Sequence, residues 1–206
     1  MKEIRILWLY SDMMDLYGDR GNIMALEYQL ELLKVPYTVT EKSLTDELSF
    51  SEYDLIYIGP GKDKNAVMAA THLRGYGEEI RRAVEEGKVF LITGNAQILF
   101  GSEIEDADGT VTSAVGLFDY KAKLTGEVFL DDFTAKPVFN KQTEIYGLIN
   151  RTSYLIGDIE NPLFEVSYSQ KDIGKTEGIL YKNFFGTWAL GPLLAKNPQI
   201  LLEILQ

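Results

Sequence analysis

Cysteine is absent from this chain of 206 residues, and histidine occurs once, at position 72. The absence of cysteine excludes disulfide bonds, thiolate metal sites and every mechanism with a cysteine nucleophile. A single histidine excludes a cluster of histidine metal ligands. We expect neither a metal nor another cofactor. His72 follows Ala69–Thr71 in a segment that favours a helix, and we expect it to have a structural role.

Positive charge is scarce as well, with 20 Lys and Arg against 31 Asp and Glu and a net charge of -11. This balance repels polyanions, and the densest basic stretch, residues 62–82, is interleaved with acidic side chains, as is typical of a solvated helix face. No apolar run approaches the roughly 18 to 20 residues that span a bilayer, and the start Met1–Glu3 shows no signal-peptide pattern. We therefore expect a cytoplasmic protein with no nucleic-acid partner and no membrane span.

What the chain does have is a series of short apolar runs separated by helical patterns. Hydrophobic residues make up 46% of it, enough for a substantial core, and we expect one domain over residues 1–206. The runs Ile4–Tyr10, Leu55–Ile58 and Val89–Thr93 are typical of strands buried on both faces of a parallel sheet. Apolar residues at spacings of three and four predict helices over about residues 23–33 and 65–86, the second broken near Gly75 and Gly77.

This alternation of strands and helices predicts an α/β fold with a central, mainly parallel sheet. Ligands of such folds bind beyond the carboxyl ends of the strands, which here are the loops 11–22, 59–65 and 93–97. The second half of the chain favours additional antiparallel or edge strands and a closing helix after Asn197-Pro198. The expected strands cover residues 121–130, 144–149, 153–156, 165–168, 178–181 and 184–190.

Two of these loops have features that suit binding or catalysis. Gly59-Pro60-Gly61 presents backbone N–H groups without side-chain obstruction, which suits an anion or an oxyanion, although a tight turn explains the glycines equally well. The spacing of a P-loop is absent. Thr93 ends a strand that turns directly into a helix, the geometry of a nucleophile elbow, and its hydroxyl would need a positioned base.

Five segments together resemble those of one family. Leu91–Gln97 resembles the Gly-x-Cys-x-Gly-x-Gln elbow of class I glutamine amidotransferases, and Tyr17–Asn22 resembles the YGDRGN segment of their CobB/CobQ-like branch. The other three matches are Gly59–Asp63 with the GGGQD oxyanion loop, Gly147–Asn150 with the GFEN strand and Gly186–Leu194 with the GTYLHGPLL segment. Within the branch, the segments most resemble the GatD group, the glutaminase subunits of lipid II isoglutaminyl synthase MurT–GatD. The resemblance implies a flavodoxin-like, three-layer fold.

The same resemblance assigns residues to a site, and several of them depart from the family pattern. Thr93 stands at the nucleophile position and Leu190 at the position of the catalytic histidine, so both reacting groups are replaced. Asn95 replaces the elbow glycine, and Arg151 replaces the histidine that often follows the GFEN strand. By resemblance, oxyanion or ligand binding falls to Gly59, Pro60, Gly61, Gly94 and Gln97, and the pocket or its supporting motifs include Asp19, Arg20, Asn22 and Asn150.

These departures predict a glutamine amidotransferase-like subunit that has lost glutaminase activity, because general-base assistance alone is worth roughly 10² to 10⁴ in rate. The subunit would bind a MurT-like or cobyrinate-synthetase-like ATP-dependent amide ligase, of cell-wall or cobalamin synthesis, fed by free ammonia. The other candidate partners are a glutamine-like small molecule in the retained pocket and a second copy of this chain in a homodimer.

Two alternatives stay open. One is an active amidotransferase or hydrolase with Thr93 as the nucleophile and Asp19 or Lys62 as the base. The other is a small-molecule or nucleotide-binding module on a flavodoxin-like fold. For a partner surface, the candidate is the exposed remainder of an apolar C-terminal segment, most of which we expect in the core. Its residues are Leu193, Leu194, Ile200, Leu201 and Ile204, with Phe184, Phe185 and Trp188 nearby.

Overall fold

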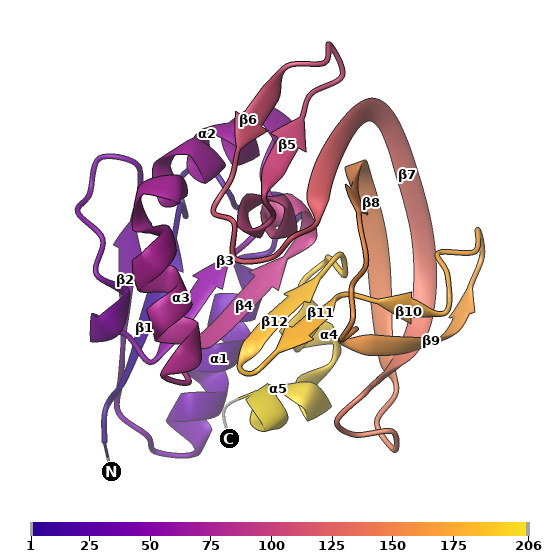
Figure 1. The fold of residues 1–206 in the computed structure, drawn as a ribbon. Coiled ribbons are helices and arrows are strands. Elements are labelled where there is room, and N and C mark those ends of the chain that lie inside the picture. The colour runs from indigo at the N-terminus through magenta and orange to yellow at the C-terminus, as the bar shows by residue number, and fades with distance from the viewer. Residues whose placement is uncertain (1, 205–206) are drawn as a thin grey trace.

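The computed structural model describes residues 2–204 and forms an α/β fold with two sheets (Figure 1). The larger sheet has six strands in the order β11-β12-β4-β3-β1-β2. They are β1 (Ile4–Leu9), β2 (Tyr37–Lys42), β3 (Leu55–Ile58), β4 (Val89–Thr93), β11 (Ile179–Tyr181) and β12 (Phe184–Thr187). Every neighbouring pair is parallel except β11 with β12. The predicted α/β class with a central, mainly parallel sheet is confirmed.

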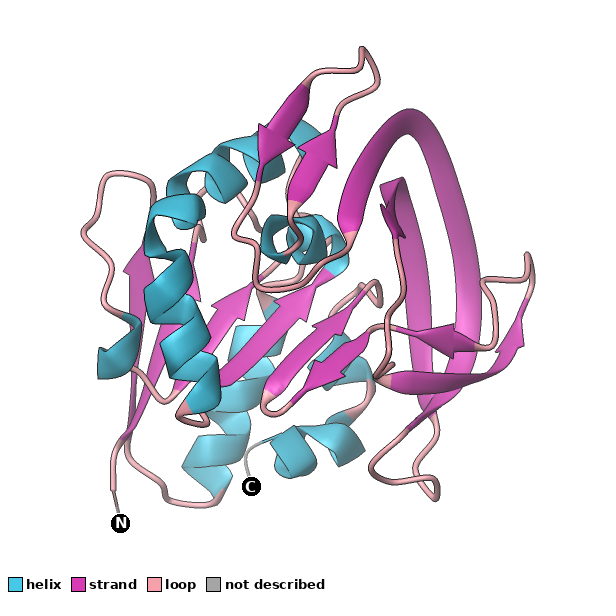
Figure 2. Ribbon diagram, viewed as in Figure 1, coloured by secondary structure: helices cyan, strands magenta, loops and turns pink. Residues whose placement is uncertain are grey.

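Helices cover both faces of this sheet and produce three layers (Figure 2). On one face lies α1 (Gly21–Leu32), and on the other lie α2 (Asp63–Leu73) and α3 (Gly77–Glu85) (Figure 1). Because both faces of the sheet are covered, all four residues of β3 are buried. This agrees with the continuous apolar run from which the strand was predicted. The predicted break between the second and third helices is confirmed as the 3₁₀ turn η2 (Arg74–Tyr76). The remaining helical elements are η1 (Phe50–Glu52), η3 (Gly94–Phe100), α4 (Leu193–Lys196) and α5 (Pro198–Ile204).

The second sheet is built around a long curved hairpin of β7 (Lys121–Pro137) and β8 (Ile145–Ile156), which stands beside the larger sheet in Figure 1. Its strand order is β10-β9-β7-β5-β6, with β8 on the other edge of β7. The further strands are β5 (Glu103–Glu105), β6 (Val111–Ser113), β9 (Phe164–Ser169) and β10 (Thr176–Glu177). The register of β7 with β8 shifts between Leu124 and Phe129, and such irregularities bend a strand.

Three details of the second half differ from the sequence-based expectation. The two strands expected at 144–149 and 153–156 are one continuous strand, β8, which begins at Ile145, and the short hairpin of β5 and β6 was not predicted. The strand expected at 184–190 ends at Thr187 and is an inner strand of the larger sheet, where β12 pairs in parallel with β4 and antiparallel with β11. Its four residues are all buried, which a position between β4 and β11 requires.

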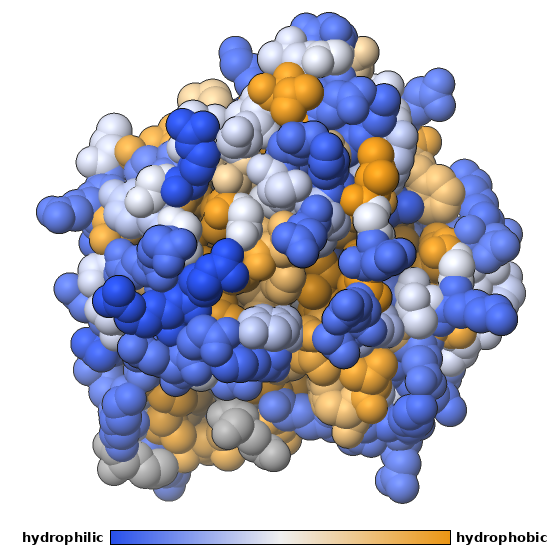
Figure 3. Space-filling view, viewed as in Figure 1, coloured by the Kyte–Doolittle hydropathy of each residue, from blue (hydrophilic) through white to orange (hydrophobic). Residues whose placement is uncertain are grey.

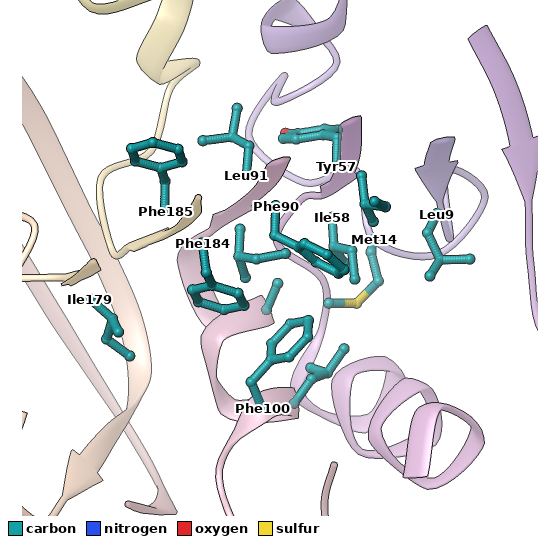
Figure 4. Packing of buried hydrophobic residues seen from close by; sticks show 14 of the residues in the cluster. Leu9, Met14, Tyr57, Ile58, Phe90, Leu91, Phe100, Ile179, Phe184 and Phe185 are labelled. Atoms are coloured by element: carbon teal, nitrogen blue, oxygen red, sulfur yellow. The ribbon is translucent and has the colours of Figure 1, made fainter. Parts of the chain in front are cut away.

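An aromatic cluster fixes β12 beside β4. The ring of Phe90 on β4 lies 6.1 Å from that of Phe184 on β12, and Phe100 of η3 meets Phe184 edge-on at 4.9 Å. Figure 4 shows these three rings turned toward one another, and all three side chains are fully buried. The cluster therefore holds the beginnings of β4 and β12, opposite their carboxyl ends, in a fixed relation. Within residues 2–204 no helix is both long and apolar enough to cross a membrane.

Candidate functional site

The carboxyl ends of β1, β3, β4 and β12 bring together four of the segments singled out in the sequence. The packing around Gly94 shows how closely they meet: an added Cβ there would lie 2.7 Å from Leu190 Cδ2 and 2.7 Å from Pro60 Cβ. Gly94 also has φ of +59°, a conformation that side chains other than glycine rarely adopt. The side chain of Leu190 therefore covers the turn that directly follows Thr93.

Thr93 itself is completely buried. Its backbone is ordinary extended chain, with φ of -113° and ψ of 149°, and the positive φ falls on the next residue. The turn therefore differs from the nucleophile elbow expected from the sequence, which would expose this side chain. The Thr93 hydroxyl instead donates a hydrogen bond to the carboxylate of Asp19.

Asp19 is the centre of a buried polar network. The same carboxylate oxygen accepts hydrogen bonds from the hydroxyls of Thr93 and Tyr57, whereas its Oδ1 has no partner within the described part of the chain. Asn22 extends the network by donating to Tyr57 Oη at 3.1 Å and accepting from the backbone N–H of Leu194 at 2.8 Å. Burial raises the pKa of Asp19 to about 6, although the hydrogen bonds from Thr93 and Tyr57 act in the opposite direction.

In the loop after β3, the backbone N–H of Gly61 already donates a hydrogen bond to a side chain. The Gly61 N–H donates to Asn95 Oδ1 at 2.9 Å, and Asn95 Nδ2 donates back to the Gly61 carbonyl at 2.8 Å. The sequence singled out this N–H as a donor to an anion or oxyanion, and Asn95 satisfies it internally. Gly59 must remain a glycine, because an added Cβ would lie 2.9 Å from the Met14 carbonyl oxygen.

A cavity of about 260 Å³ opens beside this loop. It is lined by Leu16, Tyr17, Pro60, Gly61, Lys62, Asp63, Asn95, Val128, Asn150, Arg151 and Thr152. Pro60, Gly61 and Asn150 were assigned to the site from the sequence and lie on its wall, but neither Thr93 nor Asp19 does. The arrangement therefore offers an accessible binding cavity separated from the buried hydroxyl and its carboxylate.

Other residues singled out in the sequence lie away from this cavity. The side chain of Gln97 is buried, and neither of its polar atoms has a partner among the described residues. Arg20 is exposed, with its guanidinium 4.8 Å from the centre of the Trp8 ring. His72 lies on α2 and shares a 2.7 Å hydrogen bond with the Tyr10 hydroxyl, in keeping with a structural role.

Two residues of the site were missed in the sequence, Tyr57 and Glu177. Tyr57 sits in a buried apolar strand, where nothing in the pattern distinguishes its hydroxyl from a packed ring. Glu177 is buried and accepts 2.7 Å hydrogen bonds from the Thr187 hydroxyl and the Trp188 N–H, and so anchors the chain after β12. Burial raises its pKa to about 7, and the charge of Arg151 acts against this. Among residues 2–204, no cluster of three or more Asp, Glu or His side chains is arranged to hold a metal ion.

The mainly parallel sheet thus carries a glycine loop, a strand-to-helix turn and a covering residue after β12 at its strand ends, the arrangement that a class I glutamine amidotransferase-type domain requires. The chain belongs to the family of CobB/CobQ-like glutamine amidotransferase domains, which matches residues 5–198. It is 32% identical to the lipid II isoglutaminyl synthase (glutamine-hydrolyzing) subunit GatD of Staphylococcus aureus, over 100% of this chain and 84% of that protein. It is 30% identical to the subunit of the same name from Streptococcus pneumoniae, over 98% of this chain and 79% of that protein. Among solved structures, the Trypanosoma brucei CTPS glutaminase domain with bound acivicin aligns with a TM-score of 0.47 and 7% identity over 73% of this chain and 67% of that one.

Proposed function

We propose that this chain is a GatD-like subunit that does not hydrolyse glutamine and serves an ATP-dependent amide ligase as a binding partner. The observation that carries the proposal is the state of Thr93, which occupies the family's nucleophile position, is fully buried and hydrogen-bonds to Asp19. Leu190 lies over the adjacent turn at the position of the family's histidine, and the Gly61 N–H is satisfied by Asn95. Nucleophile, imidazole and oxyanion donor are thus all missing or occupied.

One observation favours a second candidate, a hydrolase that uses Thr93 with Asp19 as its base. Asp19 accepts the hydroxyl hydrogen of Thr93, and a pKa of about 6 suits a general base at neutral pH. However, both side chains are 0% exposed and neither lines the cavity, so a substrate carbonyl has no path to the hydroxyl in this conformation. The buried pair supports a structural role for the network more than a catalytic one.

The exposed apolar surface supports a protein partner, but it does not lie where the sequence suggested. The C-terminal candidates Leu193, Leu194, Ile200, Leu201 and Ile204, and the nearby Phe184, Phe185 and Trp188, are all buried, as expected for most of them, so they leave no exposed remainder to bind a partner. Instead, one face of α1 exposes Met24, Tyr28 and Leu32 by 60%, 63% and 59%. Figure 3 shows the opposite face of the molecule, which carries α3 and where apolar side chains lie between hydrophilic ones, because α1 lies behind the sheet in this view (Figure 1). A helix with apolar residues on both faces is typical of one that is covered on both.

The role of the relatives supports an amide ligase as this partner. Both are subunits of lipid II isoglutaminyl synthase, and a chain of the same family without hydrolysis would leave its ligase dependent on free ammonia. We propose a MurT-like or cobyrinate-synthetase-like ligase, and therefore a role in cell-wall or cobalamin-type amidation.

The test is co-expression with a MurT-like amide ligase, followed by sedimentation and a ligase assay. We expect a stable complex that forms its amide product from ammonium and not from an equal concentration of glutamine. Tyr28→Glu tests the surface: it should weaken the complex, because it places a charge in the exposed apolar face of α1. A chain that stays monomeric and captures no ligase, or a complex that uses glutamine through a Thr93-dependent reaction, would contradict the proposal.

A further inference from the structure

Two positively charged side chains line the 260 Å³ cavity from different walls. Lys62 precedes α2 on the loop after β3, and Arg151 lies on β8. Among the described residues, neither forms an ion pair within 4.0 Å. In a chain with a net charge of -11, a cavity with two unpaired cations is a local exception.

The guanidinium of Arg151 is held in place by aromatic rings. It lies 4.9 Å from the centre of the Trp188 ring and 5.2 Å from that of Phe129. Partial burial lowers the pKa of Arg151, with the charge of Glu177 acting against the shift, but a guanidinium keeps its proton in proteins. Contact with two rings restricts the guanidinium, and its planar fork of N–H donors suits an oxyanion better than the ammonium of a lysine does.

The carboxylate that also lines the cavity, Asp63, is already engaged by neutral donors. Its Oδ1 accepts from Asn95 Nδ2 at 3.2 Å, and its Oδ2 accepts from the Thr152 hydroxyl at 2.5 Å. The cavity wall thus carries two cations, Lys62 and Arg151, and one carboxylate, Asp63, and so has an excess of positive charge.

Both cations are also departures from the family segments that this chain resembles. Lys62 stands where the GGGQD loop has glutamine, and Arg151 stands where a histidine often follows the GFEN strand. Two separate changes therefore add positive charge to one cavity, in the same chain in which the reacting groups are replaced by Thr93 and Leu190.

We propose that this cavity binds a small molecule with two negative charges, one oriented toward Lys62 and the other toward Arg151. The shared chemistry is an oxyanion, carried either by a dicarboxylate or by a phosphate group. The inference rests on the proposed function in one respect. A site that no longer hydrolyses glutamine does not have to bind a neutral carboxamide in preference to an anion.

Calorimetry measures the binding of three probes to the full chain and so tests this proposal. Glutarate carries two carboxylates, inorganic phosphate carries both charges on one group, and L-glutamine has no net charge. We expect glutarate or phosphate to bind more tightly than glutamine, and the tighter of these two identifies the ligand as a dicarboxylate or a phosphate compound. Lys62→Gln and Arg151→Gln should each weaken this binding about tenfold, which corresponds to about 1.4 kcal/mol.

Lys64→Gln is the matched control, because Lys64 is exposed on α2 and does not line the cavity. Arg151→Lys keeps the charge without the planar fork and should retain part of the affinity. Near-native circular dichroism of each variant establishes that it is folded. The proposal is overturned if neither anion binds, if Lys62→Gln and Arg151→Gln leave anion binding unchanged, or if glutamine binds more tightly than both anions. Glutamate release, measured on the same samples, separates such a failure from a failure of the proposed loss of hydrolysis.

Discussion

Glutamine hydrolysis is expected to appear in this chain when Thr93→Cys, Leu190→His and Asn95→Gly are combined. The first change supplies a thiol, the second an imidazole over the same turn, and the third releases the Gly61 N–H that Asn95 now occupies. General-base assistance is worth roughly 10² to 10⁴ in rate and one oxyanion donor roughly 10² to 10³. The structure predicts that the double variant Thr93→Cys/Leu190→His remains about 10² to 10³ slower than the triple variant, because Asn95 still occupies the Gly61 N–H.

Glutamate release by the wild type, the three single variants, the double variant and the triple variant measures this difference. Reaction with an electrophilic glutamine analogue reports separately whether Cys at position 93 is accessible. Equal rates for the double and triple variants would show that Asn95 does not block the oxyanion donor. A folded triple variant that neither reacts with the analogue nor hydrolyses glutamine would show that the three positions do not form a latent active site.

The stability of the chain is expected to depend on pH through Asp19. Its pKa is 3.8 in the unfolded reference and about 6 in the folded chain, because burial disfavours the charged form. Between these values the unfolded chain releases a proton that the folded chain keeps, so this residue's contribution to stability is full below pH 4 and is lost as the pH rises to about 6. A shift of about two units corresponds to about 3 kcal/mol.

Asp19→Asn removes the titration and retains an oxygen that accepts from Thr93 and Tyr57. The difference in unfolding free energy between variant and wild type should therefore increase by about 3 kcal/mol in favour of the variant between pH 4 and pH 7. Urea titrations at several pH values measure it, and Asp12→Asn, at an exposed aspartate of the same loop, is the control. Glu177 titrates in both proteins and cancels in the difference. A difference that stays constant from pH 4 to pH 7 would contradict the burial of an ionisable Asp19.

The sequence predicts the larger sheet well because its strands are continuous apolar runs. A run such as Leu55–Ile58 can be buried on both faces only between helices, so its pattern fixes both its structure and its environment. The residues Phe184–Thr187 are equally buried. The sequence nevertheless did not predict that this strand pairs in parallel with β4, because the pairing joins positions about ninety residues apart. The hairpin of β5 and β6 has three-residue strands, too short to show a periodicity.

The site was predictable as a set of loops and not as a set of contacts. The order of strands placed Gly61 and Thr93 at the carboxyl ends of the sheet, and the resemblance added Leu190 and assigned the roles of all three. Neither source revealed that Asn95 would bond to both backbone groups of Gly61. The pairing of Thr93 with Asp19 was one of two alternatives, and the sequence did not distinguish Asp19 from Lys62 as the partner of the hydroxyl. Such contacts depend on side-chain conformations across elements that are far apart in the sequence, and only the folded chain determines them.

Glutamate release from glutamine by the wild-type protein, alone and with its ligase, tests the central claim most directly. An enzyme-coupled assay at saturating glutamine, with Thr93→Ala as the reference, distinguishes hydrolysis by this site from contaminating activity. We predict that the wild type and Thr93→Ala release glutamate at the same background rate in both conditions. Release by the wild type that exceeds this background and disappears in Thr93→Ala would contradict the account and establish Thr93 as a nucleophile.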